Sequence, residues 1–139
     1  MVKRLVLSAL CILLLLAVGC GEKYGDAIEV RKDFIDLMSD YIAALDRAEN
    51  AKAVASAMNS YAEGVEALAP EIRKINKKYP ELRDPANQPE KFKKATKEQQ
   101  DVMSQFGSTF MKTMPYMKNP DVRQAQERMT KAMQSMGEQ

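Results

Sequence analysis

Residues 51–80, AKAVASAMNSYAEGVEALAPEIRKINKKYP, carry the most regular apolar pattern in the chain. Their apolar side chains recur at alternating steps of three and four residues, at Val54, Met58, Tyr61, Val65, Leu68, Ile72, Ile75 and Tyr79. Because this period matches the α-helical turn, it predicts an amphipathic helix. Asn50 can cap its start, and Pro80 should end it. We expect Pro70 to kink this helix, with a complete break as the alternative.

The same spacing predicts a helix before this stretch and two after it. The first carries Ala27, Val30, Phe34, Leu37, Tyr41, Ala44 and Ala48, widened by Ile28, Ile35 and Ile42. The third should begin near Glu90 and bend at Pro115. The side chains that we expect it to turn toward the core are Phe92, Ala95, Val102, Met103, Phe106, Phe110, Met114 and Met117. The last should start at Asn119-Pro120, end at Gly137 and bury Val122, Ala125, Met129, Ala132 and Met136.

Residues 80–89, with three prolines, predict the clearest loop, and no strand pattern or internal repeat interrupts the helices. We therefore expect an all-α fold, a small antiparallel helical bundle of three long helices plus a shorter C-terminal helix. The chain of 139 residues has room for one domain, which we assign to residues 26–139. A long coiled coil with a partner chain is the alternative, since steps of three and four residues also form a heptad seam.

The composition argues against most catalytic and nucleic-acid-binding classes. The chain has no histidine, and its two cysteines, Cys11 and Cys20, lie in the first twenty residues. Asp33, Asp36 and Asp40 share the polar side of the first helix with Arg31 and Lys32, which we interpret as a solvated face. We predict a protein that is not an enzyme, has no cofactor and does not bind nucleic acid.

The N-terminal segment is typical of a signal peptide. A basic start with Lys3 and Arg4 precedes an apolar run of 14 residues, Leu5 to Val18. As a helix this run spans about 21 Å, well short of a hydrocarbon core of about 30 Å. We therefore expect residues 1–19 to be removed, which leaves 19 basic and 19 acidic side chains.

The end of this segment, Leu16-Ala17-Val18-Gly19-Cys20, resembles the lipobox of bacterial lipoproteins. Ala17 stands where that family usually has leucine. The resemblance implies that Cys20 is acylated, becomes the new N-terminus and anchors the protein on membrane lipid, with residues 20–25 as a short linker. Gly21 follows the cysteine in place of the aspartate that commonly means inner-membrane retention. The resemblance thus favours the outer membrane, facing the periplasm, in a host with two membranes.

Methionine is concentrated in the last 37 residues, at Met103, Met111, Met114, Met117, Met129, Met133 and Met136. Core packing is the leading interpretation, because methionine fills irregular gaps well. One alternative is a periplasmic Cu(I) protein that uses Met111, Met114 and Met117, since thioethers are soft ligands. Another is an adaptable apolar groove for a partner, which an exposed Met111 would favour.

Charge is also unevenly distributed, since residues 72–97 hold 9 basic and 3 acidic side chains. If the second helix runs antiparallel to the first, it returns Lys74, Lys77, Lys78, Lys93 and Lys94 to the end near Cys20. We name these five lysines the basic tip. It would face anionic headgroups, each charge contributing up to about 1 kcal/mol, whereas the alternative is an ordinary solvated helix end.

From these features we expect an envelope lipoprotein with a binding or structural role, which acts on an envelope protein partner of unknown identity. The Met-rich helices or the polar faces of the bundle would make that contact.

Overall fold

The computed structural model describes residues 23–137, which fold into four α-helices with no strand among them. The helices are α2 (Gly25–Asp46), α3 (Ala51–Lys78), α4 (Glu90–Phe110) and α5 (Pro120–Gly137). Two short 3₁₀ segments, η1 (Pro80–Arg83) and η2 (Pro85–Asn87), lie between α3 and α4, and a third, η3 (Met111–Tyr116), lies between α4 and α5. The predicted all-α helical bundle is confirmed.

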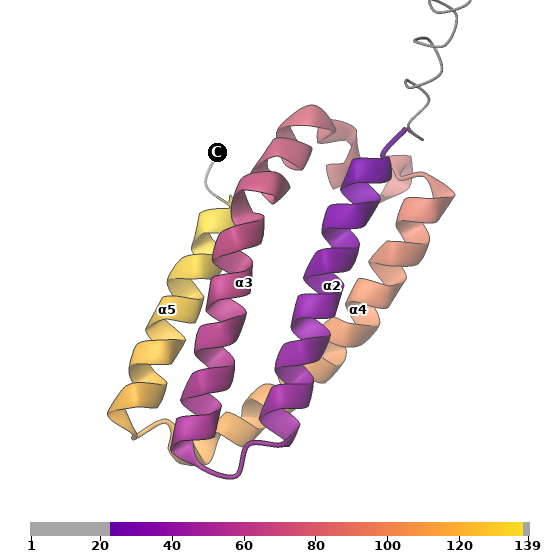
Figure 1. Cartoon of the computed structure of the whole chain (residues 1–139). Helices are drawn as coiled ribbons and strands as arrows, with labels where there is room; N and C mark the ends of the chain where they lie inside the picture. The colour runs from indigo at the N-terminus through magenta and orange to yellow at the C-terminus, as the bar shows by residue number, and fades with distance from the viewer. Residues whose placement is uncertain (1–22, 138–139) are drawn as a thin grey trace, which may run out of the picture.

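The helices stand in the spatial order α5, α3, α2, α4, as Figure 1 shows. The most extensive packing joins α3 and α5, followed by α2 with α3 and α2 with α4. Helices α2 and α4 run in one direction, and α3 and α5 run in the other. The connection through η3 therefore carries the chain from the α4 side of the bundle to the α5 side.

The main core lies between α2, α3 and α5. Its most deeply buried side chains include Met38, Met58, Val65 and Val122, each with no measurable exposure. On α2 the buried face differs from the predicted one, because Met38 and Leu45 are buried whereas Phe34, Leu37 and Ala44 are only partly buried. A helix packed between two neighbours buries a wider face than one stripe describes.

Helix α3 passes through Pro70 without a break, so the alternative of a severed helix is wrong. Its last turns arch toward the start of α2, where Lys78 and Tyr79 both reach Asp26. The side chains from Val54 to Val65 in its apolar stripe are buried, but those from Leu68 onward are only partly buried. Helix α3 is therefore continuous, and its packing weakens along its length.

The third predicted helix is shorter than expected. Helix α4 ends at Phe110, and Pro115 lies inside η3 rather than at a bend of an α-helix. Proline has no N–H and its ring clashes with the carbonyl four residues earlier, which here belongs to Met111. Met103 and Met114, which we expected to point inward, are 44% and 55% exposed.

Local sequence signals fix the helix ends. The Asn50 side chain accepts a hydrogen bond from the Ala53 N–H at 2.9 Å, as expected for an N-cap. Asn119 accepts one from the Asp121 N–H at 2.9 Å, and α5 begins at Pro120 as predicted. Residues 80–89 form the predicted connection, although Leu82 and Gln88 within it are buried.

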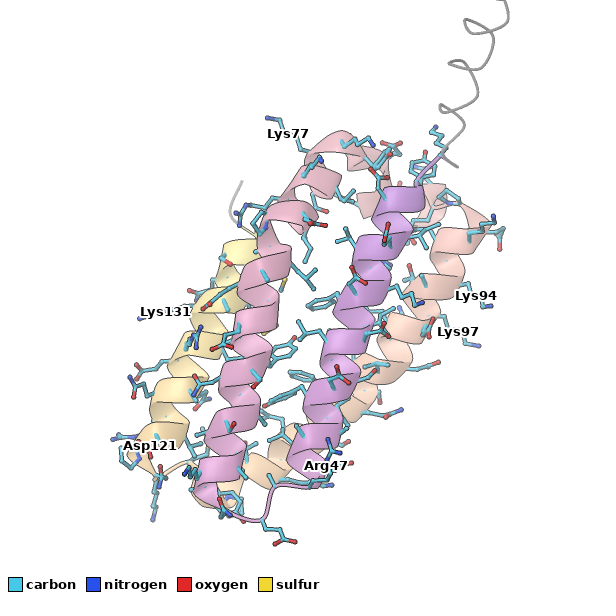
Figure 2. All side chains as sticks on the ribbon, in the orientation of Figure 1. Arg47, Lys77, Lys94, Lys97, Asp121 and Lys131 are labelled. Carbon is cyan, nitrogen blue, oxygen red and sulfur yellow. The ribbon has the colours of Figure 1, made fainter. Side chains whose placement is uncertain are left out.

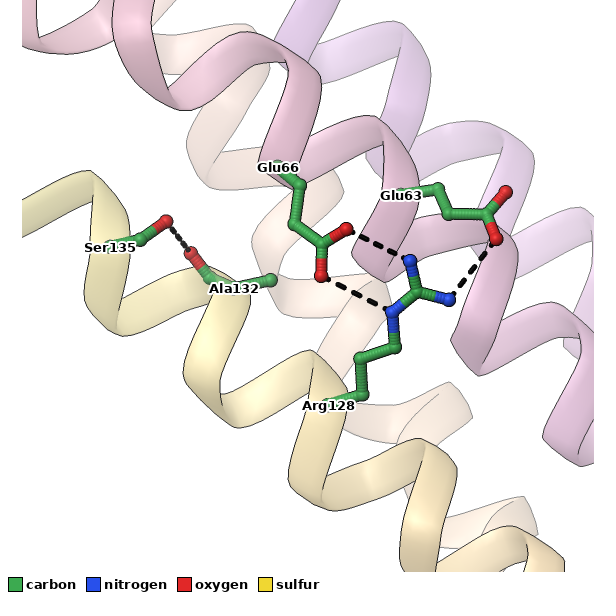
Figure 3. A network of polar contacts seen from close by, with 5 residues as sticks. All are labelled: Glu63, Glu66, Arg128, Ala132 and Ser135. Carbon is green, nitrogen blue, oxygen red and sulfur yellow. Dashed lines mark hydrogen bonds and ion pairs between the residues drawn. The ribbon is translucent and has the colours of Figure 1, made fainter.

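A charged network ties α5 to α3. Arg128 on α5 donates to Glu66 at 2.8 Å and to Glu63 at 3.1 Å, as Figure 3 shows. Hydrogen bonding to Arg128 lowers the pKa of Glu66, and the two carboxylates raise the pKa of Arg128. All three side chains are solvent-exposed to a large extent, so the network orients the helices rather than dominating their stability.

Candidate functional site

One end of the bundle gathers the start of α2, the end of α3, η1, η2 and the start of α4. Lys77 lies at this end and Lys94 on the upper part of α4, whereas Arg47 and Asp121 lie toward the opposite end (Figure 2). The antiparallel return of α3 therefore carries Lys74, Lys77 and Lys78 to the end where α2 begins, as predicted for the basic tip.

Part of the charge at this end is neutralised by ion pairs. Lys78 contacts Asp26 at 2.6 Å and Lys93 contacts Glu90 at 3.1 Å. The hydrogen bond from Lys78 lowers the pKa of Asp26. No ion pair within residues 23–137 involves the exposed Lys74, Lys77 or Lys94.

A cleft of about 270 Å³ opens between α2, α3, η1 and α4 at the same end, and we call it the tip cleft. Of the lining side chains that the structure describes, seven are aliphatic or phenylalanine, and none is acidic. They are Ala27, Val30, Phe34, Ile72, Ile75, Leu82 and Phe92. The other lining residues are Tyr79, two arginines, Arg31 and Arg83, and three carboxamides, Asn76, Gln88 and Gln99.

Arg31 lies in this lining, so our interpretation of Arg31 as part of a solvated face is wrong. Its guanidinium lies over the Phe92 ring at 4.0 Å from the ring centre and donates to the Thr96 hydroxyl. Burial lowers the pKa of Arg31 below the usual value of a guanidinium group. A cation–π contact and a neutral acceptor hold this charge in place.

The spacing of Arg31 from its neighbours in the sequence indicates that it lies at the edge of the buried face. It lies four residues after Ala27 and three before Phe34, which places it beside the apolar stripe of the first helix. The aspartates that we grouped with it, Asp33, Asp36 and Asp40, are exposed as expected. What the sequence could not supply was Phe92, since that ring arrives from a helix about sixty residues further on.

The methionines proposed for Cu(I) lie in and just after η3. Residues three apart eclipse one another in a 3₁₀-helix, so Met111, Met114 and Met117 follow one edge of this segment. Met111 and Met114 are 64% and 55% exposed, whereas Met117 packs against the main core. The Thr113 hydroxyl lies 3.9 Å from the Met117 sulfur. Core packing therefore describes Met117 and the buried Met129, and it does not describe Met111 or Met114.

The predicted lipidation site, Cys20, lies outside the described residues. Within residues 23–137 no three His, Cys, Asp or Glu side chains gather closely enough to hold a metal ion. In the same range no helix has the length and apolar character that a membrane crossing requires.

Comparison with protein-family models, with curated proteins and with solved structures gives no match for this chain. The fold and site alone define its class: in the part of the chain that the structure describes, it is a four-helix bundle with an end cleft lined by arginine and apolar side chains and by no acidic one.

Proposed function

We propose that this chain is a lipid-anchored envelope protein that acts by binding and performs no catalysis. The observation that carries the proposal is the position of the first described residues. Lys23 and Tyr24 precede α2 at the end that bears the basic tip, only a few residues after Cys20. The two acyl chains of a diacylglycerol on Cys20 would hold this end against the membrane surface, where Lys74, Lys77 and Lys94 would meet anionic headgroups.

Mass analysis of the natural product tests the anchor. We expect a protein that begins at Cys20 and carries a diacylglycerol thioether, and a Cys20→Ser variant that is no longer acylated or cut at this position. An unmodified thiol, or a leader that is still attached, would contradict the proposal.

Hydrogen exchange of the full chain in vesicles tests the orientation. In anionic vesicles, amides of residues 72–97 should exchange more slowly than in zwitterionic ones, and added salt should remove the difference. Replacing Lys74, Lys77 and Lys94 by Gln should remove it too. The control replaces Arg47, Lys52 and Lys118, which lie in or beside the connections at the other end. If the protection does not depend on lipid charge, or if the control replacements remove it to the same extent, the proposed orientation is contradicted.

A Cu(I) protein is the second candidate, favoured by the alignment of the exposed Met111 and Met114 along η3. Titration with Cu(I) under reducing conditions should then reach a stoichiometric endpoint. Replacing Met111, Met114 and Met117 together with Leu should abolish it, whereas replacing the buried Met129 should not. Weak binding that the triple replacement does not change would eliminate this function.

A further inference from the structure

We propose that the tip cleft binds a small single-chain amphiphile with an anionic oxygen head, and that Arg31 recognises this head. The ligand class is a carboxylate or phosphate monoester on a short hydrocarbon chain. This site is additional to the membrane contact proposed above, and it does not depend on acylation of Cys20.

The charge of the cleft selects an anion. Within residues 23–137, the ionised side chains that line the cleft are Arg31 and Arg83, and none of the lining side chains is an aspartate or glutamate. A guanidinium has five N–H donors, and Arg31 gives one to Thr96. Its remaining donors match the paired oxygens of a carboxylate or phosphate, which a guanidinium binds in bidentate geometry.

Burial makes Arg31 more than a surface charge. Its side chain is partly buried against Phe92, and a charge removed from water without an opposite charge is costly. An anion bound in the cleft would offset this cost. The exposed lysines of the basic tip have no such desolvation cost for an anion to offset, because water already solvates them.

The remaining lining accepts a hydrocarbon chain. Phe34, Ile72 and Ile75 face the cleft and are only partly buried, so apolar surface remains open to a ligand. A volume of about 270 Å³ corresponds to roughly nine water-sized groups at about 30 Å³ each. That volume lies near the lower limit for ligand pockets, and it suits a carboxylate head of three heavy atoms on a chain of about six further carbons.

The cleft is also held open by its own contacts. The buried Gln88 donates to the Leu82 carbonyl at 2.7 Å and accepts from the Thr96 hydroxyl at 3.0 Å. The same Thr96 hydroxyl accepts from Arg31, so one chain of hydrogen bonds links α2, α4 and the connection between α3 and α4. The Arg31 position is therefore fixed before any ligand arrives.

Photolabelling of the full chain in phosphatidylcholine vesicles tests the site. The probe is octanoate with a diazirine at the end of its chain, and labelled peptides are mapped by mass spectrometry. We expect the label on residues 72–82, with competition by octanoate or octyl phosphate and at least tenfold weaker competition by octanol. The stronger anionic competitor identifies the head, a carboxylate or a phosphate, and either result supports the site.

Arg31→Gln should reduce labelling at residues 72–82 at least tenfold. The matched control is Arg47→Gln, an exposed arginine toward the other end of the bundle, which should leave the labelling unchanged (Figure 2). Circular dichroism checks that both variants are helical. If Arg31→Gln does not fold, the competitors decide the question on the unaltered protein. Competition by octanol equal to that by octanoate, or labelling spread evenly over the bundle, would overturn the proposal.

Discussion

Tyr41 and Tyr61 place two phenol rings inside the core beside Phe106. The two tyrosine rings lie 4.9 Å apart between centres, and each is 2% exposed. Neither hydroxyl has a hydrogen-bond partner among the described residues. The rings therefore contribute apolar packing, whereas the hydroxyls carry a cost of removal from water.

Tyr61→Phe should leave the free energy of unfolding unchanged or raise it by up to about 1 kcal/mol, because it removes an unsatisfied buried hydroxyl. Urea unfolding followed by circular dichroism measures this. The control is Tyr116→Phe, since the Tyr116 hydroxyl donates to the Glu49 carbonyl at 3.2 Å and its loss should give no gain. A loss of more than about 1 kcal/mol in Tyr61→Phe would mean that its hydroxyl has a partner after all.

The same burial predicts a loss of stability at alkaline pH. It raises the pKa of Tyr61 from 10.0 to about 12 and raises that of Tyr41 as well. The unfolded chain therefore releases these protons first, so stability is complete below pH 10 and falls as the pH rises toward 12. Tyr61 alone accounts for about 2 kcal/mol of this fall.

Unfolding measured from pH 9 to 12 checks this expectation. The variant with both Tyr41→Phe and Tyr61→Phe should show a flatter curve between pH 10 and 12 than the unaltered chain. Equal slopes for the two proteins would assign the alkaline loss to other groups.

At the scale of the elements, Gly64 allows α3 to approach α2 closely. A Cβ at this position would lie 2.3 Å from one terminal methyl carbon of Leu37. Gly107 provides the contrast, because it is also inside a helix and a Cβ there meets nothing within 4 Å. The two glycines have the same helix propensity and differ in their surroundings.

Gly107→Ala should raise the free energy of unfolding by about 0.5–1 kcal/mol through helix propensity alone. Gly64→Ala should give no net gain, since pushing the Leu37 side chain off its rotamer costs about 0.5–1.5 kcal/mol. In a Leu37→Ala background Gly64→Ala should recover about 1 kcal/mol, a coupling that a double-mutant cycle measures. Equal effects at the two glycines in the unaltered chain would contradict the close approach.

At the scale of the whole molecule, the bundle has a strong core and a weaker tip. The main core joins α2, α3 and α5, whereas the buried members of the tip cluster among residues 23–137 are Ala27, Leu82 and Phe92. Local opening requires less free energy where fewer apolar contacts must be broken. The tip cleft lies in this weaker region of the bundle.

Native-state hydrogen exchange should therefore divide α3 into two parts. Amides of residues 58–66 should exchange only through global unfolding, and those of residues 74–78 should exchange faster, through local opening. Comparing exchange at several urea concentrations separates the two routes. Uniform protection along α3 would contradict a tip that opens independently.

The helices and most of their ends follow from the order of the residues along the chain. Apolar spacing, the Asn50 cap and the Asn119-Pro120 start are local features, and each depends on residues within a turn or two. The same reasoning located the loop at residues 80–89 and the basic tip. It overextended the third helix to Met117, because apolar spacing alone does not register the change to a 3₁₀ segment.

Which helices are neighbours, and which side chains they cover, depends on how the segments pack together in space. Arg31 enters a cleft because Phe92 and Thr96 arrive from α4, and Met111 and Met114 stay exposed where η3 leads away toward α5. The physical reason is that a helical period depends on backbone geometry within one segment. Burial depends instead on contacts between segments that lie far apart along the chain.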